Sequence, residues 1–247
     1  MLALSLGALD QLGHQYGPRS HEVQDLLARA DIAIGRLLDV LDQEVGAGRY
    51  TLAWSADHGV ARIPEQVVAE GGQAGRLGSI SQMATGLLQW TLGPGRHVGL
   101  GDGSELALTP SALAKLREKP EVKALLTSAL AASPGAWKVF DRDTLASTEP
   151  TSDPELRAWR LSFVPDRSGD FAVVMKPGWV YDALGANHGS QNAYDQRVPL
   201  ALYGAGIRKG RYTTAATPAD IAPTLAALAG ISMPSAQGRV LTEALER

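Results

Sequence analysis

The sequence predicts an α/β fold in which a mostly parallel sheet is sandwiched by helices. Short apolar runs suited to buried strands alternate with a long helical pattern over the first 60 residues, and this rhythm returns after residue 186. In addition, aspartate and histidine side chains follow the predicted strands, and open parallel sheets hold their ligands at that edge.

The first elements in chain order form a predicted βαβ unit. An apolar run from Leu2 to Leu6 predicts a strand buried on both faces, and Asp10 and His14 lie in the connection after it. Ser20 is placed to cap a helix reaching about residue 45, because apolar residues recur at helical spacing and two glycines follow. Residues 50–55 then form the next strand, which ends at the Asp57–His58 pair.

Residues 61–185 differ from the flanking sequence, with glycine clusters at 71–78 and 93–103. We expect one domain, in which residues 1–60 and 186–247 form a metal-binding α/β core and residues 61–185 form an inserted lobe. The chain length of 247 residues and the 45% hydrophobic content suit a single globular unit of this kind.

Within the lobe, Pro110 and Pro120 each open a predicted helix, since proline suits the first helical turn. Residues 159–164 and 170–176 are expected to be strands of a hairpin. After the lobe, residues 198–203 predict a buried strand, and Thr217 with Asp220 is a close relative of a capping box at the start of a last helix.

Five side chains form the candidate metal ligands: Asp10, His14, Asp57, His58 and His188. The chain has no cysteine, so a bound metal must use histidine and carboxylate ligands, which suit zinc. Asp57 and His58 are adjacent and can reach one metal only if the chain turns there, and Gly59 makes that turn easy.

The segments D-x-x-G-H (10–14), A-D-H-G (56–59) and N-H-G-S (187–190), in this order, resemble the alkaline phosphatase superfamily. The type I phosphodiesterase and nucleotide pyrophosphatase branch is the most similar. The likeness includes the helix between the first two motifs and the C-terminal segments 194–210 and 220–225, and it is weak across the lobe.

The resemblance implies an alkaline-phosphatase-like fold that is incomplete at its N-terminus, and up to two zinc ions. Asp10, His14 and His188 would hold one ion, and Asp57 and His58 would belong to an incomplete second site. The family's threonine or serine nucleophile lies on an N-terminal half, and no position here corresponds to it, so the catalytic residues are left unknown.

Three functions are left open by the sequence. The first is the C-terminal portion of a metal-dependent phosphomonoesterase or phosphodiesterase. The second is a single-metal hydrolase whose metal-bound hydroxide attacks without a covalent nucleophile. The third is a non-catalytic metal-binding or interaction module with an exposed sheet edge.

The expected partner is a small phosphate ester. A net charge of −3 gives no basic footprint for a nucleic acid polymer, and no apolar run is long enough to span a membrane. A homo-oligomer or a complementing N-terminal half are further expected partners. The family resemblance suggests a periplasmic or secreted protein, although the apolar start lacks the basic region of a signal peptide.

The remaining polar candidates have simpler interpretations. His21 and His97 are expected on the surface without a metal role. Asp220 is explained as a helix N-terminal carboxylate, and Ser190 has no evident base.

Overall fold

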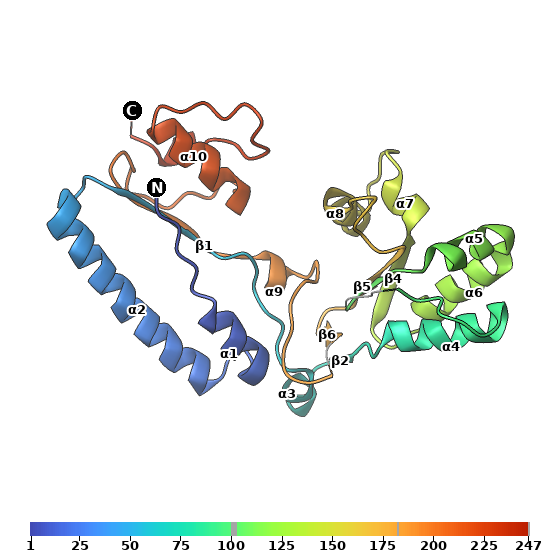
Figure 1. Ribbon diagram of the computed structural model, residues 1–247. Coiled ribbons are helices and arrows are strands. Elements are labelled where there is room, and N and C mark those ends of the chain that lie inside the picture. Colours follow the sequence, from blue (N-terminus) through green and yellow to red (C-terminus); the bar gives the residue numbers. More distant parts are fainter. Residues whose placement is uncertain (100–102, 182, 247) are drawn as a thin grey trace. The chain divides into compact units, whose positions relative to one another are not determined.

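A computed structural model describes residues 1–99, 103–181 and 183–246, and Figure 1 shows its helices and short strands. The chain divides into two compact units. Met1–Val23 and Val60–Gln196 form the first unit, and Gln24–Gly59 and Arg197–Arg247 form the second. The predicted division into a 1–60 and 186–247 core and a 61–185 lobe stays a prediction.

The first unit begins with an extended segment and then helix α1 (Ala8–Tyr16). The strand predicted at residues 2–6 is wrong: this segment is irregular, and Leu2, Leu4 and Leu6 are 75%, 62% and 51% exposed. A strand needs a hydrogen-bonded neighbour, and the described residues provide none for this run. Asp10 and His14 consequently lie on a helix rather than in a connection after a strand.

The main core of the first unit surrounds an antiparallel sheet in the order β3-β5-β4. The strands are β3 (Glu105–Leu106), β5 (Phe171–Met175) and β4 (Ala136–Asp141). All five residues of β5 are buried, as expected for the central strand. The helices α4 (Ile80–Leu92), α5 (Pro110–Glu118) and α6 (Pro120–Ala131) pack with this sheet (Figure 1).

The starts of these helices follow from local chemistry. Pro110 and Pro120 occupy the first turns of α5 and α6, as predicted, because that position needs no backbone N–H. The side chain of Thr109 accepts a hydrogen bond from the backbone N of Ala112, and Ser79 does the same for Gln82 at the start of α4.

The strand predicted at residues 159–164 is wrong, because the chain forms helix α8 (Pro154–Ser162) there. Asp153 caps this helix by accepting from the backbone N of Glu155 and Leu156, and Pro154 fits its first turn. The predicted strand at 170–176 is confirmed as β5, but its neighbours are β3 and β4 instead of a hairpin partner. The short helix α7 (Arg142–Ala146) contacts both β4 and α8.

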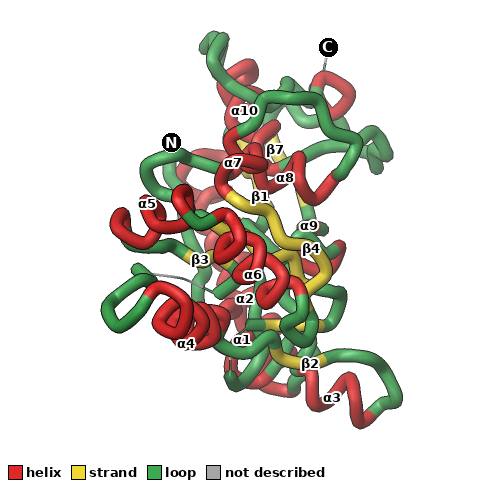
Figure 2. The backbone as a smooth tube through the Cα atoms, turned by 90° about the vertical axis from the view of Figure 1, so that its right-hand side faces the viewer, coloured by secondary structure: helices red, strands yellow, loops and turns green. Residues whose placement is uncertain are grey.

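The rest of the first unit is made of short elements. These are α3 (Pro64–Ala69), β2 (Gly75–Arg76), β6 (Trp179–Val180) and α9 (Ala193–Gln196). Strands β2 and β6 pair in parallel, and α3 lies beside β2 (Figure 2).

His97 is buried in the first unit, so the prediction of a surface position is wrong for it, whereas His21 is exposed as expected. The backbone around His97 is drawn into the core by a bridge between Val98 and Leu108 and by the bond from Thr109 N to His97 O. Its Nε2 lies 2.8 Å from the carbonyl oxygen of Gly93. The glycine-rich sequence suggested an exposed loop, and residues 94–96 are exposed, but the contacts with Leu108 and Thr109 bury His97 and Val98.

The second unit contains a two-stranded sheet, and helix α2 (His21–Leu41) runs into it from the first unit. A π-helical turn η1 (Asp42–Gly46) extends α2 to the glycines that end the predicted helix. Strand β1 (Thr51–Ser55) pairs with β7 (Leu200–Gly204), so both predicted strands are present. The remaining elements are η2 (Pro218–Asp220), α10 (Ile221–Leu228), which contacts β1, and η3 (Thr242–Ala244).

Strands β1 and β7 are antiparallel, and β2–β6 is the only parallel pair among the described strands. The expected βαβ unit is therefore absent from the described residues, since its first strand is not formed. The predicted helix start near Thr217 is confirmed: Thr217 and Asp220 form a complete capping box. None of the described helices is both long and apolar enough to cross a membrane.

Candidate metal centre

Three of the five predicted ligands meet in the first unit. The ligand atoms of Asp10, His14 and His188 all lie within 4.8 Å of one another. Asp10 Oδ1 is 3.5 Å from His14 Nε2 and 3.4 Å from His188 Nε2. The two imidazole rings lie with their centroids 4.8 Å apart. We call these three side chains the Asp–His–His cluster.

Helix α1 places Asp10 and His14 side by side because they are four residues apart, which puts them on one face of a helix. Both lie toward solvent, with side chains 44% and 34% exposed. The His188 side chain is 24% exposed. A metal or substrate can therefore reach the cluster without opening the core.

The orientation of the His14 ring is fixed by its second nitrogen. Nδ1 lies 2.9 Å from the carbonyl oxygen of Ala186 and donates to it, so Nε2 faces Asp10. The backbone adds a bond of 2.8 Å from Ala186 N to His14 O. Gly185 permits this approach: it has φ +66°, and a Cβ there would lie 2.1 Å from His14 O.

The segment that carries His188 is held on both sides by buried polar groups. Asn187 is 3% exposed, and its Oδ1 accepts from the backbone N of His188 at 2.6 Å. Asp195 is 2% exposed and accepts from both the backbone N and the hydroxyl of Ser190. Gly189 has φ +92°, so the chain turns in the left-handed region immediately after His188.

The two separations between Asp10 and the histidines fit neighbouring ligands of a tetrahedral metal ion. Nitrogen and oxygen ligands lie about 2.0–2.2 Å from zinc, which puts two of them about 3.4 Å apart on a tetrahedron. The distances of 3.4 and 3.5 Å match that separation and exceed the usual 2.7–3.2 Å of a hydrogen bond. With three protein ligands, such an ion keeps a position for water or substrate.

Asp57 and His58 lie in the second unit, directly after β1. The Asp57 side chain is 88% exposed, and its Oδ2 lies 3.5 Å from His58 Nε2. His58 Nδ1 donates to the carbonyl oxygen of Gly59 at 2.9 Å, which orients the ring as Ala186 orients that of His14. The chain bends at Asp57, and Gly59 is not among the glycines with positive φ, so the turn expected at Gly59 is not formed there.

Two residues that support the cluster were not assigned a role from the sequence. Asp195 binds Ser190 within the segment after His188, and Asn187 caps the backbone of His188. The sequence signal is an aspartate five residues after the serine of N-H-G-S, but only the fold shows that it turns back onto that serine.

Residues 1–191 match the family model of type I phosphodiesterase / nucleotide pyrophosphatase. The chain belongs to this family. Among curated relatives, it is 31% identical over 255 residues to a calcium-transporting ATPase of Myroides odoratus, and 28% identical over 254 residues to the alkaline phosphatase PafA of Elizabethkingia meningoseptica. Each match covers 100% of this chain and 46% of the relative. This member of the family thus spans about half the length of the curated relatives it matches.

Solved structures agree with the family assignment. The crystal structure of wild-type alkaline phosphatase PafA matches with a TM-score of 0.87 and 27% identity over 98% of this chain and 47% of that chain. Human ectonucleotide pyrophosphatase / phosphodiesterase 5 matches in fold with a TM-score of 0.68 and 21% identity, over 96% of this chain and 56% of that one. The predicted α/β, alkaline-phosphatase-like fold is therefore confirmed.

Proposed function

We propose that this chain supplies a zinc site of a phosphate-ester hydrolase. The observation that carries the proposal is the Asp–His–His cluster, in which Asp10 lies from each histidine at the separation expected for two ligands of a tetrahedral ion. The family assignment and the names of the relatives, which include alkaline phosphatases, support a phosphomonoester or phosphodiester as substrate.

In the proposed mechanism, each side chain of the cluster has a defined task. Asp10 would supply a negatively charged oxygen ligand, and His14 and His188 would each supply the electron pair of Nε2. A zinc ion bound there would stabilise negative charge on the leaving-group oxygen and lower the pKa of a bound water toward about 7. Ala186, Asn187 and Asp195 keep the ligands in place, so that little reorganisation accompanies binding.

Asp57 and His58 are proposed to hold part of a second zinc site. Their ligand atoms are 3.5 Å apart, the same separation as in the cluster, and two protein ligands leave coordination positions for other groups. The nucleophile and the remaining ligands are proposed to come from a complementing N-terminal half, in the part of the relatives' length that this chain does not span.

A second candidate is a hydrolase that uses one zinc ion and no covalent nucleophile. The observation that favours it is that Asp10, His14 and His188 are assembled within one compact unit. This candidate requires weak, zinc-dependent turnover by the chain alone.

The test combines zinc affinity with hydrolysis of p-nitrophenyl phosphate and bis-p-nitrophenyl phosphate. For His188→Ala, we expect zinc affinity to fall at least roughly 100-fold, since loss of a supporting partner alone costs 10–100-fold. His21→Ala is the control, because His21 is an exposed histidine outside the cluster. Zinc binding without turnover supports the shared site, and turnover lost in His188→Ala supports the one-metal mechanism. Unchanged zinc affinity in His188→Ala would overturn both.

A further inference from the structure

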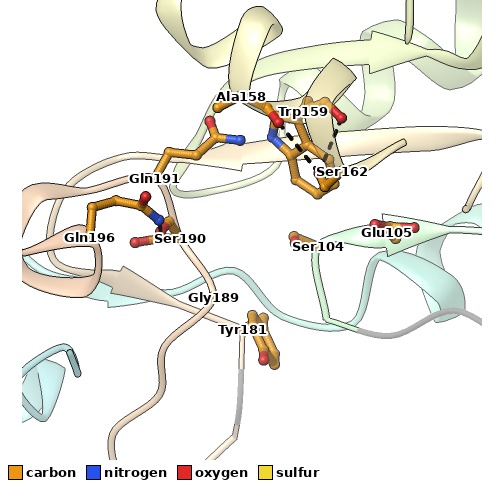
Figure 3. Close-up of a pocket in the computed structure, with 10 residues that line it drawn as sticks. All are labelled: Ser104, Glu105, Ala158, Trp159, Ser162, Tyr181, Gly189, Ser190, Gln191 and Gln196. Carbon is orange, nitrogen blue, oxygen red and sulfur yellow. Dashed lines mark hydrogen bonds between the residues drawn. The ribbon is translucent and has the colours of Figure 1, made fainter. Parts of the chain in front are cut away.

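A cavity of about 570 Å³ lies in the first unit, at the segment that follows His188 (Figure 3). Its volume is within the range of about 300–1,000 Å³ that is usual for small-molecule sites. Gly189 and Ser190 form part of its wall. Since consecutive Cα atoms are about 3.8 Å apart, this wall begins one residue from a ligand of the Asp–His–His cluster.

The described lining residues are mainly uncharged hydrogen-bonding groups with two aromatic rings. Trp159 and Tyr181 supply the rings, and Gln191 and Gln196 supply amides. Glu105 is the one charged side chain among the described lining residues, and none of these is Lys or Arg. A second phosphate or a carboxylate would therefore meet a like charge without a compensating cation.

Hydrogen bonds to the backbone hold two of the polar lining side chains in place. Glu105 Oε2 accepts from the backbone N of Gly169 at 2.7 Å, and Gln196 Nε2 donates to Ser190 O at 3.0 Å. Such fixed groups lose little freedom when a ligand binds, which favours specific recognition.

The side-chain oxygen of Gln191 accepts no hydrogen bond from the described residues. Its side chain extends toward Trp159 (Figure 3), and its carbonyl oxygen is buried with no hydrogen-bond partner among the described residues. A buried acceptor without a donor is unfavourable, so rotation of the amide into the cavity, where a ligand hydroxyl would donate to this oxygen, is favoured. Trp159 beside it offers a flat apolar face for the C–H side of the same ligand.

We propose that this cavity binds the alcohol part of the substrate and selects an uncharged group rich in hydroxyls, such as a sugar or another polyol. The proposal rests on the proposed function, which places the phosphate of the same ester at the cluster. It names the substrate class as phosphate esters of polyols.

The main experiment is calorimetric titration of the zinc-loaded chain with glucose 6-phosphate, butyl phosphate, phosphocholine and inorganic phosphate. We expect glucose 6-phosphate to bind at least tenfold more tightly than butyl phosphate. Gln191→Ala and Trp159→Ala should each remove most of that preference and leave the affinity for inorganic phosphate unchanged. Trp90→Ala is the matched control, because Trp90 is 81% exposed and lies outside the cavity.

Equal affinity for glucose 6-phosphate and butyl phosphate would overturn the proposal, as would tightest binding of phosphocholine. Since Trp159 packs on Phe140 and its neighbours, loss of folding in Trp159→Ala would leave Gln191→Ala as the deciding variant.

A second measurement separates this proposal from the proposed function. Saturation-transfer NMR with methyl α-glucoside and the metal-free chain requires no zinc. Transfer that disappears in Gln191→Ala supports the cavity even where zinc fails to bind, which would overturn only the metal site. Absence of transfer to the wild-type chain would overturn the cavity proposal.

Discussion

Asp10 faces two imidazoles with a single carboxylate oxygen, at 3.4 and 3.5 Å. Both distances exceed the usual 2.7–3.2 Å of a hydrogen bond, so the carboxylate lies near both histidines without bonding closely to either. The ring of His14 is fixed by its bond to the carbonyl oxygen of Ala186, and the backbone N of His188 is fixed by the side chain of Asn187. The positions of the two histidines therefore depend on these supporting hydrogen bonds more than on contacts within the cluster.

Asp195 is the supporting residue whose loss is most informative. Asp195→Asn keeps the size of the side chain but removes the charge that accepts from the N and Oγ of Ser190. We expect zinc affinity to fall by up to about 10-fold, the low end of the range for partners that bond a ligand directly, because Asp195 bonds Ser190, two residues after His188. The measurement is competition with a zinc chelator, checked by circular dichroism. Asp166→Asn, on an exposed loop, serves as the control, and equal zinc affinity in folded Asp195→Asn would contradict the supporting role.

The members of the Asp–His–His cluster could be named from single residues, while the contacts that support them could not. Asp10, His14 and His188 follow from residue type and motif spacing, and the structure brings them together. The burial of His97 and the contact of Asp195 with Ser190 depend on chain segments that meet only in the fold. Metal binding by all five predicted ligands stays a prediction.

Among the elements, the sequence predicted helices correctly where residues at the helix start determine them. It predicted strands wrongly where a strand needs a hydrogen-bonded partner strand. Pro110 and Pro120 identified the starts of α5 and α6. The run at 2–6 has the composition of a strand but no strand partner among the described residues. Residues 159–164 contain strand-forming side chains, yet the Asp153 cap and Pro154 upstream start a helix that includes most of them.

Asp153 is expected to make α8 sensitive to acid. A hydrogen bond from Lys138, opposed by burial and aided by the backbone N of Leu156, lowers the pKa of Asp153 from 3.8 to about 2. The pKa is lower in the folded chain, so the stabilisation is complete above about pH 4 and is lost as the pH falls toward 2.

The test is urea denaturation of Asp153→Ala, followed by circular dichroism. At neutral pH, the variant should lose about 1 kcal/mol of unfolding free energy, the usual contribution of an N-cap. Its stability should also fall less steeply than that of the wild type between pH 4 and 2. Glu118→Ala, at the exposed end of α5, should retain the wild-type profile. Identical acid profiles for Asp153→Ala and the wild type would rule out this role of the carboxylate.

On the scale of the whole molecule, the cluster joins the start of the chain to residue 188. Zinc that binds only the folded form should therefore stabilise the first unit, by about 2.7 kcal/mol when its free concentration is 100 times its dissociation constant. We expect one equivalent of zinc to slow amide hydrogen exchange in residues 8–16 and 185–190 more than in α6. Mass spectrometry of exchanged peptides measures this difference, and His188→Ala should abolish it. Uniform slowing across the unit, or none, would argue against an ion at the cluster.

The overall class was predictable because the motifs and the helical periodicity are local, and the match to alkaline phosphatase PafA confirms it. Sheet topology was less accessible to sequence reasoning. Strands β1 and β7 run antiparallel, and nothing in their apolar patterns distinguishes that pairing from a parallel one.

The backbone bond of 2.9 Å from Ala61 N to Asn187 O joins two positions that are distant in the sequence. The two ends of the intervening segment therefore lie close together. In such a geometry, insertions and exchanges of whole segments are well tolerated. Most of the cavity wall belongs to that segment, whereas the three ligands lie outside it. Trp159 and Tyr181 of the cavity wall lie in that segment, whereas Gln191 lies outside it with the cluster. Replacement of the segment would therefore change the aromatic part of the proposed alcohol site and leave the Asp–His–His cluster in place.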